Sequence, residues 1–176
     1  MAHTYRRVLT GHNEDGRSII LSDATATTVK EMKPITGLVA TDLWETRGAP
    51  ASNAGDEDAA DRPVALEPPQ NGTVFRMVEF PPDTAWSNDA DAAAAFATIG
   101  AAHVSNATSS DPLMHRTNSV DYLTVVKGEI WAVMEEGEVC LKEGDIMVQR
   151  GTNHSWSVRT EEPCLVSAVL VSAEPL

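Results

Sequence analysis

The sequence predicts an all-β protein: an antiparallel barrel or sandwich with extra N-terminal strands and one helix. The first observation is that short β-type runs alternate with glycine-containing turns between His115 and His154. Glycine supplies the positive φ that tight reversals need, and strands this short that reverse this often are typical of antiparallel sheets. The second is that one segment, Ser87–His103, combines helix caps with a run of alanines.

Four N-terminal segments have the apolar composition of strands: Tyr5–Leu9, Ser18–Leu21, Gly37–Thr46 and Thr73–Phe80. Thr25–Lys33 shows no clear periodicity. Arg47–Asp61 is rich in small and acidic residues, which favours a solvated loop. We expect the N-terminal strands to extend the sheets of a barrel or to pair with a second subunit.

The helix predicted at Ser87–His103 carries one apolar stripe made by Phe96, Ile99 and His103, at helical spacing. Gly100 favours an early end of this helix. Two interpretations stay open: the stripe packs on the outside of the barrel, or the helix is a lid with His103 facing a pocket.

The C-terminal third holds the densest series of predicted strands: Val120–Val126, Ile130–Glu135, Glu138–Leu141, Ile146–Gln149 and Cys164–Val171. We therefore interpret residues 113–176 as the barrel core. Residues 1–112 supply N-terminal strands, the acidic loop and the helix, and the whole chain forms one domain.

Charge and hydropathy exclude two classes of partner. The chain of 176 residues has 13 lysines and arginines against 26 aspartates and glutamates, a net charge of −13. An acidic surface repels phosphate backbones and anionic lipids, so we expect neither nucleic acid nor membrane as a partner. No apolar run approaches the roughly 20 residues of a transmembrane helix, and the N-terminus lacks a signal-peptide core, so we expect a cytoplasmic protein.

The spacing of residues from His115 onward resembles the cupin family. The first cupin motif is G-x5-H-x-H-x3,4-E-x6-G, and this chain offers His115, Thr117, Asp121 and Gly128 at matching intervals. The second motif is G-x5-P-x-G-x2-H-x3-N, and this chain offers Gly144, Asp145, Arg150, Gly151 and His154. The resemblance implies a cupin-type antiparallel β-barrel, or jelly roll.

The chain departs from both motifs. Ser109 stands in place of the opening glycine, Thr117 in place of the second histidine and Asp121 in place of the glutamate. Arg150 replaces the proline, the second motif is one residue shorter before its glycine, and Val158 replaces the closing asparagine. The fold is therefore expected to carry over fully and the metal site only in part.

The resemblance implies a site of His115, Asp121 and His154 inside the barrel, with Thr117 and Trp156 beside them. Trp131 and Met147 are candidates for its apolar wall. Two histidines and a carboxylate can hold Fe(II), and Mn, Ni, Co or Zn are further candidates. Because threonine is a poor substitute for imidazole, a barrel without metal is the equal alternative.

The function that this site predicts is a cupin-type enzyme for a small organic molecule, with a carboxylate or an aromatic, polyketide-like compound as candidate substrates. The reaction classes are dioxygenase, decarboxylase, isomerase and dehydratase. The alternative is a metal-free cupin that binds a small molecule or performs acid–base isomerisation or dehydration. Arg116 or Arg150 could hold a substrate carboxylate. The resemblance also implies a homodimer.

Overall fold

The computed structural model describes residues 2–86, 92–104, 111 and 113–175 of the chain. The described strands are β1 (Arg6–His12), β2 (Ser18–Thr25), β3 (Val29–Glu31), β4 (Val39–Thr46), β5 (Thr73–Phe80), β6 (Ser119–Lys127), β7 (Glu129–Met134), β8 (Glu138–Lys142), β9 (Ile146–Gln149), β10 (His154–Ser157) and β11 (Cys164–Ser172). The helical elements are η1 (Asp83–Ala85), α1 (Ala92–Ala97) and η2 (Ala102–Val104). The predicted all-β class with one helix is confirmed.

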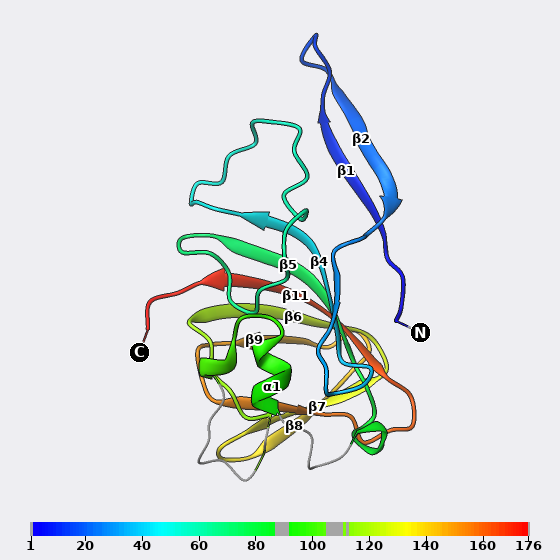
Figure 1. Ribbon diagram of the computed structural model, residues 1–176, viewed down its shortest axis with the longest axis vertical. Coiled ribbons are helices and arrows are strands. Elements are labelled where there is room, and N and C mark those ends of the chain that lie inside the picture. The colour runs from blue at the N-terminus through cyan, green and yellow to red at the C-terminus, as the bar shows by residue number, and fades with distance from the viewer. Residues whose placement is uncertain (1, 87–91, 105–110, 112, 176) are drawn as a thin grey trace.

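Two sheets form the barrel (Figure 1). The larger has the strand order β3-β4-β5-β11-β6-β9, and the smaller has the order β10-β7-β8. Every strand pairing that the structure describes is antiparallel. Because β11 lies between β5 and β6, the C-terminal strand joins the N-terminal strands to the motif-bearing ones.

Strand β6 shows the alternation that places the site. Asp121, Leu123 and Val125 are buried, whereas Tyr122 and Val126 are exposed, as the period of a strand requires. The strand ends in a tight turn at Gly128, whose φ is +84°. A Cβ there would lie 3.2 Å from the carbonyl oxygen of Pro163, so both conformation and space favour glycine.

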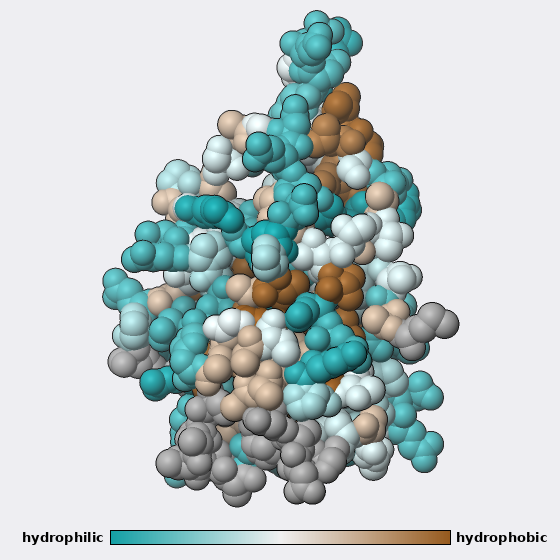
Figure 2. All heavy atoms as spheres, viewed as in Figure 1, coloured by the Kyte–Doolittle hydropathy of each residue, from teal (hydrophilic) through white to brown (hydrophobic). Residues whose placement is uncertain are grey.

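The N-terminal strands divide into two groups. β4 and β5 belong to the barrel sheet, and β3 is a short edge strand in the segment without predicted periodicity. β1 and β2 instead form a separate hairpin that projects from the barrel (Figure 1). Apolar side chains gather along this hairpin in Figure 2, and Val8 and Ile20 are 45% and 62% exposed.

The helical segment is shorter than predicted. Within the predicted range, residues 87–91 lie outside the described part, and α1 ends at Ala97. Gly100 has a φ of +72°, the left-handed conformation expected just beyond a helix end. His103 lies in η2, and its ring is exposed and pairs with Glu67 at 3.1 Å. The prediction that His103 faces the pocket is therefore wrong, because the chain leaves the helical path before that residue.

No helix in the described ranges is both long enough and apolar enough to cross a membrane.

Candidate active site

A pocket with a cavity volume of about 100 Å³ lies inside the barrel. Its lining draws on two apolar clusters: one joins α1 to the segment before β4, and the other joins β6, β7 and β11. The lining residues are Met32, Leu38, Ala40, Leu66, Arg76, Val78, Phe80, Ile99, His115, Asp121, Leu123, His154, Trp156, Val166, Ala168 and Leu170. The three predicted site residues His115, Asp121 and His154 thus share one largely apolar cavity.

Backbone pairing brings the two motif histidines together. The N–H of each donates to the carbonyl of the other at 2.9 Å, in an isolated antiparallel bridge between His115 and the start of β10. The ring centroids are 4.3 Å apart. The ring of Phe96, from α1, lies 4.7 Å from that of His115 and covers it. His115 and His154, which are 39 residues apart in the sequence, therefore lie side by side.

Each imidazole is fixed in one orientation by a local carbonyl. His115 Nδ1 lies 2.8 Å from the oxygen of Leu113, and His154 Nδ1 lies 3.0 Å from the oxygen of Thr152. A carbonyl can only accept, so Nδ1 carries the proton in both rings. In the neutral ring Nε2 is then left as an acceptor, the form in which histidine binds a metal or removes a proton.

Burial keeps both rings neutral. It lowers the pKa of His115, despite the hydrogen bond to Leu113. Burial, reinforced by the neighbouring His115, lowers the pKa of His154 to about 3. Two charged imidazoles side by side in an apolar cavity would repel each other and lose their hydration.

Asp121 reaches the pocket from β6, where β11 and β9 pair on either side of the strand. The residue is 7% exposed, and its Oδ1 has no hydrogen-bond partner among the described residues. Burial raises the pKa of Asp121 to about 6, although a hydrogen bond from Ser119 and the charge of Arg76 act in the opposite direction. This carboxyl can therefore exchange a proton near neutral pH.

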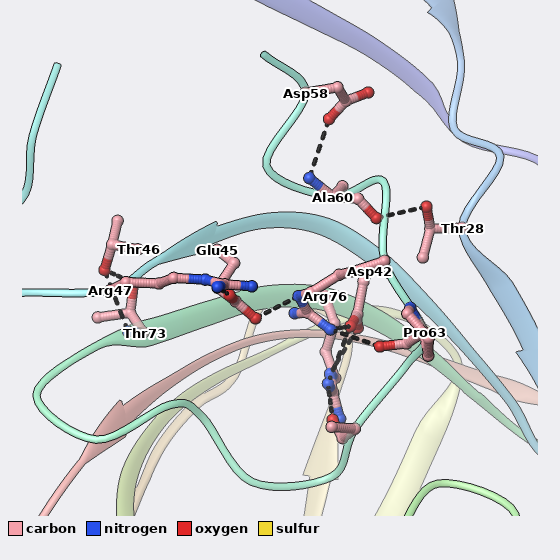
Figure 3. A network of polar contacts seen from close by, with 12 residues as sticks. Thr28, Asp42, Glu45, Thr46, Arg47, Asp58, Ala60, Pro63, Thr73 and Arg76 are labelled. Carbon is pink, nitrogen blue, oxygen red and sulfur yellow. Dashed lines mark hydrogen bonds and ion pairs between the residues drawn. The ribbon is translucent and has the colours of Figure 1, made fainter. Parts of the chain in front are cut away.

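Arg76 lines the same pocket from β5, and its guanidinium is bound by Asp42 and by backbone carbonyls (Figure 3). Its Nε lies 2.9 Å from Oδ1 of Asp42, and its Nη1 and Nη2 donate to the carbonyls of Leu66 and Ala65. Asp42 is fully buried and also faces Arg62 at 3.0 Å. Arg62 contacts Glu45 in turn, so a network of alternating charges lies between the pocket and the protein surface.

The other predicted pocket residues occupy different places. Trp156 lines the cavity, and its ring centroid lies 5.7 Å from that of His154. Thr117 is buried and is hydrogen-bonded to the Ser119 hydroxyl at 2.8 Å, but it is not among the lining residues. Met147 packs on the cluster below the cavity, beside Leu123. Trp131 lies under the guanidinium of Arg159 at 4.3 Å, outside the pocket.

The arginine predictions need correction. Arg116 and Arg150 are exposed and do not line the pocket, because each sits on the outward side of its segment. Arg76, which sequence reasoning missed, lines it instead. A signal was present: Arg76 alternates with Val74, Val78 and Phe80 on one face of its strand. A charge in the middle of an apolar stripe indicates a buried, paired residue.

The donor set fits a metal in part. The two histidines present the tautomer that metal ligation requires, and Asp121 has an unpartnered oxygen in the same cavity. Within the described ranges, however, no three histidine, cysteine, aspartate or glutamate side chains lie close enough together to hold a metal ion. The pair of imidazoles is therefore in place, and a third protein ligand is not.

Comparison with known proteins gives relatives with cupin names. No family model matches the chain. The chain is 29% identical over 157 residues to the cupin-domain-containing oxidoreductase virC of Hypocrea virens, covering 85% of this chain and 65% of that one. It is 28% identical over 157 residues to the cupin-domain-containing oxidoreductase fogC of Aspergillus ruber, covering 85% of this chain and 62% of the relative.

A shorter match is closer in sequence. Over 51 residues the chain is 55% identical to the phomopsin biosynthesis cluster protein C' of Diaporthe leptostromiformis, covering 28% of this chain and 27% of the relative. Among solved structures, a putative ethanolamine utilization protein from Salmonella typhimurium overlaps with a TM-score of 0.44 at 14% identity, covering 98% of this chain and 100% of that one. The chain thus spans about a quarter of one curated relative and less than two thirds of the others. The motif spacing, the antiparallel barrel and the similarity to cupin-domain-containing oxidoreductases over 85% of this chain are thus features that it shares with cupins.

Proposed function

We propose that this protein is a cupin-type enzyme that acts on a small organic molecule inside the barrel. The observation that carries the proposal is the shared cavity, in which His115, His154, Asp121 and Arg76 are the polar side chains of an otherwise apolar wall. Perturbed titratable groups in an apolar pocket are typical of active sites. The names of two relatives, both cupin-domain-containing oxidoreductases, support an enzymatic role.

In the metal-assisted form of the proposal, His115 and His154 would hold a divalent metal through Nε2, and Asp121 would have to move closer to them to become the third ligand. Fe, Mn, Ni, Co and Zn are the candidates. Such a metal would supply Lewis acidity or electron transfer, which imidazole and carboxylate groups do not supply by themselves. The carbonyls of Leu113 and Thr152 orient the two imidazoles for this role.

A metal-free form is favoured by a separate observation, the raised pKa of Asp121. A carboxyl with a pKa of about 6 is ready to give or take a proton near neutrality. The neutral imidazole of His115 can accept the second proton that an isomerisation or dehydration moves. If the protein only binds a small molecule and does not convert it, the same side chains would make the contacts.

Elemental analysis of protein purified without chelator and without a metal-affinity tag tests the metal-assisted form. We expect one Fe, Mn, Ni, Co or Zn per chain, reduced sharply in His154→Ala because one of few ligands is lost. The matched control is His103→Ala, which removes an exposed histidine outside the pocket. Absence of metal from the wild type, or equal loss in both variants, would leave the acid–base form as the one to pursue.

A further inference from the structure

We propose that the pocket selects an uncharged, mostly apolar molecule that presents a hydroxyl or N–H donor to Asp121, and that it discriminates against carboxylates. This inference rests on the proposed function, because it concerns the same cavity. It goes further by stating the class of ligand that these residues recognise.

The body of the ligand is set by the walls. Twelve of the sixteen lining residues are apolar or aromatic, and they come from both apolar clusters. Ile99 and Leu66 border the cavity on the helix side, and Leu123 and Leu170 border it on the sheet side. A charged or highly polar body would lose its hydration here without compensation, whereas a hydrocarbon body gains from burial.

The polar end of the ligand is set by unpaired acceptors. Asp121 is more than nine-tenths buried, lines the cavity and has an Oδ1 without a partner in the described part of the chain. The strand that carries it is paired on both sides, so the carboxyl cannot leave for solvent without breaking the sheet. An unpaired buried acceptor is costly, and a ligand O–H or N–H would satisfy it.

The two imidazoles add acceptors of the same kind. Since both Nδ1–H groups donate to backbone carbonyls, the neutral rings of His115 and His154 present Nε2 lone pairs. The side chains of Asp121, His115 and His154 therefore offer oxygen and nitrogen acceptors in place of donors. A ligand carboxylate, which only accepts, has no complementary group among them.

Arg76, the cation among the lining residues, does not change the preference for uncharged ligands. Arg76 is occupied by Asp42 and by two backbone carbonyls. If the Arg76 side chain turned toward a ligand, the buried carboxylate of Asp42 would lose one of the two ion pairs that the described residues form with it. A ligand carboxylate in the cavity would also lie near the carboxyl of Asp121, which opposes a second negative charge.

Calorimetric titration with three probes of similar shape tests the proposal: 2-phenylethanol, its methyl ether and phenylacetate. The alcohol donates a hydrogen bond, the ether has the oxygen without the donor, and phenylacetate is an anion. We expect the alcohol to bind about tenfold more tightly than either of the others, the effect of one satisfied buried acceptor.

Variants assign the effect to its residue. Asp121→Leu should bring alcohol and ether within about twofold of each other, because the acceptor is gone. Asp121→Asn, which keeps the shape, serves if the leucine variant does not fold, and it should weaken the preference for the alcohol. Tyr122→Phe, on the outward face of the same strand, is the control and should keep the wild-type order.

Tighter binding of phenylacetate, equal binding of all three probes, or no binding at millimolar concentrations would overturn the proposal, as would a preference for the alcohol that survives Asp121→Leu. Metal content, measured on the same sample, and turnover report on the proposed function separately. If the expected binding order is found but neither metal nor turnover is detected, this inference holds and the proposed enzymatic function is rejected.

Discussion

The substitution Asp121→Asn should stabilise the protein at pH 8 and destabilise it by about 1 kcal/mol at pH 4, where the cost of burying the amide is not offset. Burial raises the pKa of this carboxyl from 3.8 to about 6. The native state therefore binds more protons than the unfolded state between these two values, so the stability contributed by the group is present below about pH 4 and lost above about pH 6.

The magnitude follows from the same shift. A change of the pKa from 3.8 to about 6 corresponds to about 3 kcal/mol of unfavourable free energy in the ionised form. The residue is 7% exposed, so solvent screening removes little of it. Burying the asparagine amide costs about 1–2 kcal/mol, which leaves a net gain of about 1–2 kcal/mol at pH 8. A gain of this size raises Tm by about 3–6 °C in a chain of this length.

Urea unfolding of wild type and variant in the presence of EDTA, at pH 4 and pH 8, measures this difference. Asp15→Asn, which removes an exposed carboxyl in the β1–β2 turn, is the matched control and should show no such pH dependence. A variant less stable than wild type at pH 8 would refute the reasoning, because it would mean that the ionised carboxylate is satisfied in the folded protein. An equal gain at both pH values would refute it as well.

Three further predictions concern the surroundings of the site. Arg76→Met should lower the free energy of unfolding by about 3 kcal/mol, because Asp42 stays buried with less compensation; a neutral effect in urea unfolding would contradict this. In the Asp121→Asn background, Tm should fall as pH decreases from 6.5 toward 3, because His154 has its pKa lowered to about 3 in the fold; constant Tm in this range would speak against a neutral, buried ring. We also propose a homodimer in which the second subunit covers the projecting hairpin and its exposed apolar side chains. Residues 1–25 contain equal numbers of arginines and carboxylates, so this segment does not share the net charge of −13 that would repel a second copy. Light scattering should give twice the chain mass, and Ile20→Glu should yield a monomer; a wild-type monomer at micromolar concentration would rule this out.

Local pattern was sufficient for most strands. The period of two on β6 placed Asp121, Leu123 and Val125 inside and Tyr122 outside, and the structure has them so. The glycine turns gave the boundaries of the C-terminal strands to within about two residues, as expected for elements whose ends depend on local chemistry. The three-residue strand β3 was not predicted, because so short a segment is formed by its partner β4 rather than by its own sequence.

The helix shows where local pattern fails. Alanine content and caps predicted a segment as far as His103, with Gly100 favouring an earlier end; the described helix ends at Ala97 and Gly100 has a φ of +72°. Phe96 and Ile99 of the predicted stripe are buried, with Phe96 over His115, whereas His103 lies outside and pairs with Glu67. Helical spacing describes a stripe only as far as the helix continues.

The sequence by itself determined the class of fold and the two histidines of the site, because both depend on local periodicity and motif spacing. Only the tertiary structure decided which other side chains meet them. Arg76 reaches the pocket because β5 pairs with β11. Asp121, which motif spacing already indicated, lies on β6 at the other side of β11. Trp131, on an equally plausible strand, faces away from the cavity and lies under Arg159. Period alone states that alternate residues share a face, but the neighbouring sheet decides which face encloses the cavity.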